Sequence, residues 1–351
     1  MAITTRALQK TKPGVGAELK EVVLPEVGSR DVLIKVDVMG ICGSDVQTYN
    51  WEPTAVAKVT SRGTKFPWTF GHEFAGTVVE AGKDVQSVKP GDRVAGETHG
   101  PCGQCFPCKT GHRHICTNMK LIGSGYPGIF SDYTVLPEMC AIKLPDAMTS
   151  QQGAVLEPLG VAVHSVTEAD VSGKPVVIIG VGPIGLFAVA AAKHLGATQV
   201  FGTARTQSKL DVATAMGADT TLNPLKVDVV AAVRAATGGY GAGAVIDMTG
   251  DPEAIMQGLS MLRTRGRLVM VAQLKGPLPP ALSVALTRKE IQVTGIWGRR
   301  MYDTWMLIEH LVTSGKIDVA KVTGDTYPLA EFEAAFKDAS ANAMGRVLLV
   351  P

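Results

Sequence analysis

The chain has 351 residues, a formal charge of only +2 and a hydrophobic content of 46%, which together allow two domains with sizeable cores. The nearly balanced charge, without long basic or acidic runs, argues against a nucleic acid partner. No apolar stretch is long and uninterrupted enough to cross a membrane, and the N-terminus lacks the apolar core of a secretory signal. We therefore expect a cytoplasmic protein with neither a membrane nor a nucleic acid partner.

The first part of the chain shows patterns typical of β-strands. Short apolar runs at 32–38 and 76–80 are bounded by glycine and proline turns. A Pro-Gly-Asp turn at 90–92 leads into another strand that ends near residue 95. Because few helical repeats occur before about residue 150, this part predicts a β-rich domain.

Strands and helices alternate after residue 149. The segment 149–167 predicts a helix, and the last segment, 321–351, returns to strand-like runs. The alternation between these segments predicts a doubly wound parallel sheet with helices on both faces, so the fold class is α/β. We assign 1–158 and 299–351 to one discontinuous domain and 159–298 to a second. The predicted strands are 176–179, 199–203, 244–247, 267–272 and 292–296, and the predicted helices are 183–195, 206–216, 252–263 and 302–314.

A glycine-rich turn joins the first strand of the second domain to its first helix. The turn reads Gly180-Val-Gly182-Pro183-Ile184-Gly185, and in this context it indicates a dinucleotide cofactor whose pyrophosphate binds at the helix N-terminus.

The end of the next strand bears on the choice of cofactor. Ala204 and Arg205 stand where an acidic residue would accept a hydrogen bond from the ribose of NAD. Because a guanidinium pairs well with a phosphate dianion, the sequence favours NADP over NAD.

Four of the six cysteines fall within fifteen residues, with the spacing C-x2-C-x2-C-x7-C. Thiolates this close in sequence can converge on one tetrahedral ion. A disulfide scaffold is not expected without a secretory signal, whereas four thiolates could also hold an iron–sulfur cluster. The sequence favours a structural zinc ion, and its predicted ligands are Cys102, Cys105, Cys108 and Cys116.

Residues typical of a catalytic metal site flank this cysteine cluster on both sides. A thiolate, an imidazole and a carboxylate can bind zinc and leave a fourth position open for substrate. We predict Cys42 and His72 as two ligands and Glu157 as the third. Glu73 is predicted to lie nearby, where it can either replace Glu157 as a ligand or contact the ligands without binding the metal itself. We expect Asp45 to hydrogen-bond the other ring nitrogen of His72 and so to orient it.

Three segments carry a resemblance to a known family. They are 40–51, around the first predicted ligand, 96–102, which has His99 three residues before the cysteine cluster, and 295–305. The whole pattern resembles the zinc-dependent medium-chain alcohol dehydrogenases, and within them the L-threonine 3-dehydrogenase branch, a relative of the sorbitol dehydrogenases. The resemblance implies a GroES-like catalytic domain beside a Rossmann domain. It also implies hydride transfer between a secondary alcohol and NAD(P), two zinc ions per chain and a homotetramer.

The resemblance also assigns roles near the first ligand, and the chain departs from the family at several places. Ser44 would take the proton of the alcohol and pass it towards the nicotinamide ribose. His99 would either position a polar group of the substrate or cap a loop beside the cysteine cluster. Gln47 stands where a histidine usually completes the proton relay, and Val161 stands where threonine dehydrogenases usually carry asparagine. The segment 52–67 is longer and more basic than the family pattern.

Two classes of substrate and one non-catalytic role compete. An L-threonine-like amino alcohol is favoured by the 295–305 segment and by His99. A polyol, sugar alcohol or diol is favoured by the Leu-Glu-Pro-Leu-Gly context at 156–160 and by the missing asparagine. A zinc-free binding protein is disfavoured because the predicted ligands Cys42, His72 and Glu157 are all present.

Overall fold

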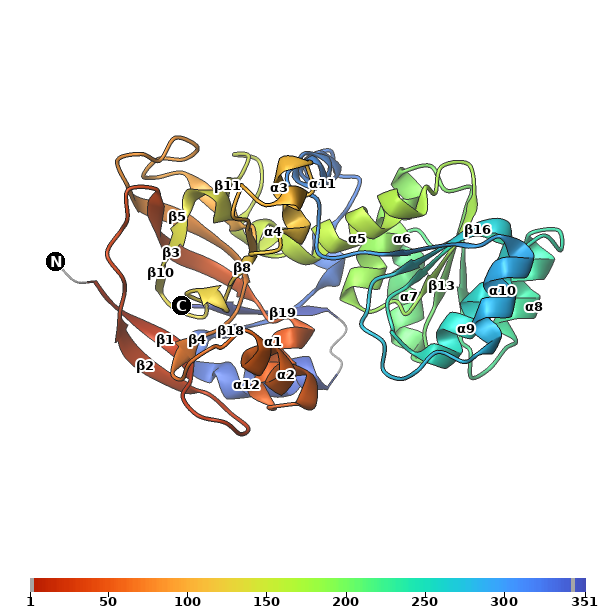
Figure 1. Cartoon of the computed structure of the whole chain (residues 1–351), viewed down its shortest axis with the longest axis horizontal. Helices are drawn as coiled ribbons and strands as arrows, with labels where there is room; N and C mark the ends of the chain where they lie inside the picture. The colour runs from red at the N-terminus through yellow and green to blue at the C-terminus, as the bar shows by residue number, and fades with distance from the viewer. Residues whose placement is uncertain (1–2, 342–344) are drawn as a thin grey trace. The chain divides into compact units, whose positions relative to one another are not determined.

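The computed structural model describes residues 3–341 and 345–351, and the chain divides into two compact units (Figure 1). Unit 1 comprises the chain up to Glu157 together with the segment from Thr323 onward, and unit 2 runs from Pro158 to Val322. Both units combine helices with sheets, so the predicted α/β class is confirmed. In the described part of the chain, no helix is long and apolar enough to span a lipid bilayer.

Residues 299–322 lie in unit 2, although the sequence analysis placed them in the catalytic domain. Arg299 shows why, because this fully buried side chain fills the space that Gly160 leaves open. Its guanidinium also lies 5.4 Å from the centre of the Trp305 ring, in α11 (Asp303–Thr313). The order of strands and helices in the sequence does not reveal that Arg299 packs against Gly160 and Trp305. Residues 299–322 were therefore assigned together with the C-terminal strands that follow them.

Unit 1 is built on a mainly antiparallel sheet of seven strands. Its order is β11-β6-β5-β3-β19-β18, and β10 also pairs with β3. The C-terminal strand β19 lies antiparallel to β3, so the end of the chain completes a sheet made by its beginning. Two three-stranded sheets, β2-β1-β4 and β7-β8-β9, complete the unit. The strands of unit 1 are β1 (Thr4–Lys10), β2 (Glu18–Val23), β3 (Asp31–Gly40), β4 (Trp68–Thr69), β5 (Glu73–Ala81), β6 (Arg93–Gly96), β7 (His99–Gly100), β8 (Lys120–Ile122), β9 (Gly125–Tyr126), β10 (Tyr133–Pro137), β11 (Ala141–Lys143), β18 (Thr323–Pro328) and β19 (Arg346–Val350).

The sequence analysis did not predict the helices α1, α2 and α12 of unit 1. All three have nine residues or fewer, and α1 buries only Asp45, so no apolar stripe marks it. Phe336 of α12 reaches into the core, where its ring centre lies 5.9 Å from those of Phe70 and Phe130. The helices are α1 (Gly43–Tyr49), α2 (Pro53–Ser61), α3 (Phe106–Lys109), α4 (Ser150–Ala154) and α12 (Phe332–Ser340), with short 3-10 turns at Arg113–Ile115, Glu138–Cys140 and Leu329–Glu331.

Unit 2 is a parallel sheet of six strands in the order β14-β13-β12-β15-β16-β17. Helices cover both faces, as Figure 1 shows: α6 and α7 pack together on one, and α8, α9 and α10 on the other. The strands are β12 (Pro175–Ile179), β13 (Gln199–Thr203), β14 (Thr220–Leu222), β15 (Ala242–Asp247), β16 (Leu262–Met270) and β17 (Gln292–Gly295). The helices, besides α11, are α5 (Leu156–Ala169), α6 (Pro183–His194), α7 (Gln207–Ala215), α8 (Val229–Ala236), α9 (Pro252–Met261) and α10 (Ala281–Lys289), with a 3-10 turn at Val319–Val322.

The alternation read from the sequence of unit 2 agrees with this arrangement. Every predicted strand and helix there has a counterpart, whereas β14, α8 and α10 were not predicted. The helix predicted over 149–167 is two helices, because the chain turns at Val155 between α4 and α5 (Leu156–Ala169). The strands β12 and β15 are almost wholly buried, as expected for the centre of a parallel sheet.

Candidate metal centres and active site

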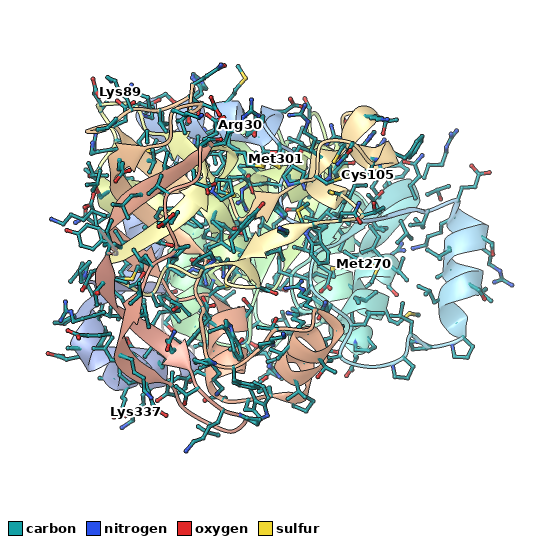
Figure 2. All side chains as sticks on the ribbon, turned by 60° about the vertical axis from the view of Figure 1, so that its left-hand side comes forward. Arg30, Lys89, Cys105, Met270, Met301 and Lys337 are labelled. Atoms are coloured by element: carbon teal, nitrogen blue, oxygen red, sulfur yellow. The ribbon has the colours of Figure 1, made fainter. Side chains whose placement is uncertain are left out.

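The four clustered cysteines converge as the sequence predicts. One ligand atom of each lies within 4.8 Å of the others, and the Sγ atom of Cys105 lies 3.4 Å from that of Cys108 and 3.6 Å from that of Cys116. A tetrahedral zinc ion with Zn–S bonds of about 2.3 Å requires sulfur–sulfur distances of about 3.8 Å. The sulfurs are therefore spaced for a single ion rather than for a larger cluster. Cys105, labelled in Figure 2, precedes the short helix α3.

Backbone amides already point at these sulfur atoms. The N–H groups of Cys102 and Asn118 each donate to the Sγ of Cys116 at 3.3 Å. Hydrogen bonds, the backbone N–H of Cys108 foremost, lower the pKa of Cys105 to about 5, and burial raises the pKa of Cys108 to about 12. The pKa values of the two thiols thus differ widely. A bound cation would favour the thiolate form of both, because each thiol must ionise to bind a metal. These residues fit zinc.

The second predicted site is assembled where β3 ends and β5 begins. Ligand atoms of Cys42, His72 and Glu73 lie within 4.8 Å of one another. Gly40, the last residue of β3, is directly opposite Glu73 in the strand register. A Cβ atom at Gly40 would lie 2.6 Å from Oε2 of Glu73, so only glycine leaves room for this carboxylate. The pairing of β3 with β5 thus brings Cys42 close to Glu73, although the two residues are 31 positions apart in the sequence.

Asp45 contacts both Cys42 and His72, of which the sequence predicted only the contact with His72. Its Oδ2 accepts the backbone N–H of Cys42 at 3.0 Å, at the start of α1. Its Oδ1 lies 3.5 Å from Nδ1 of His72, and the side chain of Asp45 is only 5% exposed. A proton on Nδ1 that faces Asp45 leaves Nε2 of His72 available as a metal ligand.

Burial and charge act against each other at this pair of ligands. Burial alone lowers the pKa of His72, but the charge and hydrogen bond of Asp45, followed by those of Cys42, together raise the pKa well above the ordinary value. Burial alone raises the pKa of Cys42, but the hydrogen bond and charge of His72 bring it down to about 7. A thiol with this pKa ionises readily near neutral pH, as a metal ligand must.

Two carboxylates lie near these ligands, and the structure distinguishes their surroundings. Glu73 is fully buried, and burial raises its pKa well above the ordinary value while Arg346 opposes the rise. The Nε of the buried Arg346 lies 3.1 Å from Oε2 of Glu73, and this guanidinium also donates to the carbonyl of Ile41. Glu157, at the start of α5, instead accepts the hydroxyl of Thr98 at 3.3 Å.

The structure therefore places Glu73, rather than Glu157, in the compact ligand group. Among the described residues, Glu157 is not part of the set with ligand atoms within 4.8 Å of each other. The sequence analysis preferred Glu157 because motif spacing says nothing of strand register. It also missed Arg346 and Thr98. A charged residue that opens the buried strand β19 was the available signal for Arg346.

His99 is the first residue of β7, and its imidazole contacts a buried carboxylate. Its Nδ1 is 2.6 Å from Oε1 of Glu97, which also accepts the backbone N–H of His99 at 2.9 Å, and both side chains are buried. The hydroxyl of the preceding residue, Thr98, donates to Glu157 at 3.3 Å. Ser44, by contrast, lies in the first turn of α1, two residues after Cys42.

The glycine motif forms the turn that the sequence predicts between β12 and α6. Gly180 has φ of +89°, and its N–H and that of Val181 both donate to the carbonyl of Thr203 at 3.1 Å. A Cβ atom at Gly185 would lie 2.1 Å from the carbonyl oxygen of Gly180. Gly182 precedes α6, and Pro183 and Ile184 open it without any side chain capping the N-terminus. The first N–H groups of α6 can therefore bind a phosphate.

Two basic residues, Arg205 and Lys209, follow β13 in the sequence, and no acidic residue stands between them. The backbone of Ala204 is fixed by the carbonyl of Leu222 at 3.3 Å, and the exposed Arg205 follows it. Lys209, in the first turn of α7, has a pKa lowered by burial and then by the charge of Arg205. The sequence analysis did not single out Lys209.

Family models match both units. The model of the alcohol dehydrogenase GroES-like domain matches residues 28–146, and that of the zinc-binding dehydrogenases matches 183–313. The chain belongs to the zinc-binding alcohol dehydrogenases, and it is an oxidoreductase of that class.

Individual proteins with similar sequences or structures indicate which branch of the family this chain resembles. L-threonine 3-dehydrogenase of Bacillus subtilis is 40% identical over 346 residues, which cover 99% of this chain and 98% of the relative. The crystal structure of 2R,3R-butanediol dehydrogenase of Bacillus subtilis matches with a TM-score of 0.87 and 27% identity over 99% of both chains. A structure from Sinorhizobium meliloti, described as a zinc-binding dehydrogenase bound to NADP, matches with a TM-score of 0.89 and 28% identity, covering 99% of this chain and 100% of that one. The chain is thus similar to the threonine dehydrogenase branch, as the sequence analysis expected.

Proposed function

We propose that this protein oxidises an L-threonine-like amino alcohol at its secondary hydroxyl group, using zinc and preferring NADP. The observation that carries the proposal is the group of Cys42, His72 and Glu73, whose ligand atoms lie within 4.8 Å of one another. A thiolate, an imidazole and a carboxylate leave one position open for a substrate oxygen, which is typical of catalytic rather than structural zinc.

The residues around the proposed metal have separate tasks. Zinc, when bound, would act as a Lewis acid that stabilises the alkoxide form of the alcohol. Cys42, His72 and Glu73 would hold it, and Glu157, held by Thr98, could replace Glu73. Ser44 is placed to accept the proton of the alcohol. Two zinc ions per chain are expected, because the four clustered cysteines would hold a second.

The relatives support an amino alcohol as the substrate, whereas one difference from the threonine dehydrogenases favours a second substrate class. The relative with 40% identity acts on L-threonine by its name. Val161 replaces the asparagine of that branch, however, and the solved structures similar to this chain include a butanediol dehydrogenase. A polyol or diol is therefore the alternative substrate.

A substrate panel with a metal count tests both points. Purified protein would be assayed with L-threonine, sorbitol and 2,3-butanediol, each with NAD and with NADP, and its zinc content would be measured. We expect the highest kcat/KM for L-threonine and two zinc ions per chain. Activity on none of these alcohols, in protein that binds zinc and cofactor, would refute the proposed function.

The preference for NADP is supported by the two cations at the end of β13. Arg205 follows β13, Lys209 lies in the first turn of α7, and burial and then the charge of Arg205 lower the pKa of Lys209. No acidic residue stands at 204 to repel a 2′-phosphate. A charge-assisted hydrogen bond contributes about 1.5–3 kcal/mol, which corresponds to a preference of roughly tenfold to a hundredfold.

Two substitutions and a control test the cofactor proposal. Arg205→Ala should lower kcat/KM with NADP by about tenfold to a hundredfold and change that with NAD little. Ala204→Asp should reverse the preference, because the new charge repels the phosphate. Arg288→Ala, which removes an exposed arginine from α10 on the other face of the sheet, is the matched control. Equal use of both cofactors, unchanged by Arg205→Ala, would overturn the proposal.

The proposal includes a homotetramer, as the family resemblance implies, in which the edge of the parallel sheet is a candidate contact between two copies. β17 has only one neighbour among the described strands, and Val293 on it is 44% exposed. An unpaired edge strand is a template for a second copy. Light scattering should give a tetramer mass, and Val293→Lys should lower it. A monomer mass at micromolar concentration would contradict this.

A further inference from the structure

Lys10 is a fully buried lysine that neither predicted metal centre nor the cofactor motif uses. It is the last residue of β1 and is 0% exposed. Its ammonium group donates to the carbonyl oxygens of Gly14, of Gly16 at 2.8 Å and of Tyr49 at 3.1 Å. An ammonium has three N–H donors, so each one has an acceptor. Buried lysines are rare unless they are paired, and here three carbonyl groups provide the pairing.

An aromatic ring lies next to the three carbonyl groups that surround Lys10, and together they form what we call the Lys10 cage. The Nζ of Lys10 lies 5.1 Å from the centre of the Trp51 ring, close enough for a cation–π interaction. Burial lowers the pKa of Lys10 to about 8, so the ammonium form still predominates at neutral pH.

Lys10 contributes the one charged contact to the C-terminal end of α1 among the described residues: the carbonyl of Tyr49 accepts its ammonium group at 3.1 Å and the N–H of Gly16 at 2.8 Å. The Tyr49 ring also stacks on Phe336, with 4.5 Å between the ring centres. Tyr49 is the last residue of this helix, which has only seven residues and no basic residue in its last turn. Short helices are marginally stable alone, and their last carbonyl groups favour a cation. Lys10 supplies that cation from a strand that precedes the helix by more than 30 residues.

The opposite end of α1 is the proposed active site. Cys42 precedes the first turn, and Asp45 in that turn contacts both the N–H of Cys42 and Nδ1 of His72. A helix of two turns is too short to absorb a shift at one end without moving the other. The position of Ser44 and Asp45 therefore depends on what holds Tyr49.

We propose that Lys10 is a positioning residue of the active site, which holds α1 by its C-terminal carbonyl and thereby sets the positions of Ser44 and Asp45. The inference rests on the proposed function for its catalytic consequence, but the hold on α1 can be measured without turnover.

The test compares Lys10→Met, which keeps the length of the side chain and removes its donors, with Leu8→Ala. Leu8 is a fully buried residue of the same strand that contributes to the core and not to the cage. Both variants should lower the melting temperature. Zinc-loaded protein would be assayed well below that temperature for kcat and for KM of alcohol and cofactor. Hydrogen exchange of the amides at 43–50 would be followed by mass spectrometry.

In Lys10→Met we expect exchange at 43–50 to accelerate by about tenfold, the factor expected for losing a hydrogen bond to a charged group. We expect kcat to fall by about tenfold to a hundredfold, as small misplacements of catalytic groups do, while KM for the cofactor stays within about twofold. Leu8→Ala should change neither kcat nor exchange at 43–50.

Two results would overturn the inference. The first is a kcat in Lys10→Met within about twofold of the unmodified enzyme. The second is equal acceleration of exchange in both variants, which would make Lys10 merely structural. If the unmodified protein oxidises no alcohol, the proposed function fails, and the exchange comparison alone decides whether Lys10 holds α1.

Discussion

Replacing Asp45 by asparagine should weaken zinc binding at the Cys42 site while leaving the fold of α1 intact. Asparagine has the shape of aspartate, and its side-chain oxygen can still accept the N–H of Cys42, now 3.0 Å from Oδ2. What disappears is the negative charge 3.5 Å from Nδ1 of His72, on a side chain that is 5% exposed. The substitution therefore isolates the electrostatic effect on the metal ligand.

The expected loss follows from this geometry. A partner that hydrogen-bonds the second nitrogen of a ligating histidine typically contributes about tenfold to a hundredfold in metal affinity, or about 1.4 to 2.8 kcal/mol. Because Asp45 is buried, water cannot replace its charge, so we expect a value in the upper half of this range.

Competition with a chelator measures the effect. The fraction of zinc released against chelator concentration should show two populations, of which only the weaker shifts in Asp45→Asn. Asp92→Asn is the matched control, since Asp92 is also buried in unit 1 but pairs with Lys89 and Lys143. It should lower stability without changing zinc release. Zinc affinity within about threefold of the unmodified protein in Asp45→Asn would refute the reasoning.

Three further substitutions should have separable effects. Cys105→Ser should remove one zinc ion per chain and lower the melting temperature, because a closed zinc site contributes folding energy; a retained second zinc on elemental analysis would contradict this. Gly40→Ala should displace Glu73, whose Oε2 would lie 2.6 Å from the new Cβ, and so reduce kcat and zinc affinity, and unchanged zinc release would count against it. Gly185→Ala should abolish NADP and NAD binding measured by fluorescence, since its Cβ would meet the carbonyl of Gly180 at 2.1 Å; retained affinity would show that the turn can adapt.

The parts of the structure that depend on local sequence were predictable. The strand, glycine turn and helix at 175–194 form one continuous pattern, and the four cysteines lie so close in sequence that only a few loop geometries bring them together. In each case the physical constraint acts over fewer than about 20 residues, which a sequence displays directly.

The parts that depend on pairing between distant segments were not predictable. The presence of Glu73 in the compact ligand group follows from the register of β3 against β5, which places Glu73 opposite Gly40. Arg346 reaches Glu73 only because β19 pairs with β3. The helix α1 was missed because its seven residues offer only Val46 and Tyr49 to the core, and its other contacts come from Lys10 of another strand and from Asp45 at its start.

The return of the C-terminal strand to β3 has a consequence for how this protein is made. All the predicted metal ligands have been synthesised once residue 157 is translated, but the guanidinium that pairs with the buried Glu73 belongs to Arg346, in β19. A nascent chain therefore carries Glu73 without its counter-charge until residue 346 has been added. Damage to the C-terminus, by premature termination or by proteolysis, would act at the metal site itself, although it leaves every ligand in place.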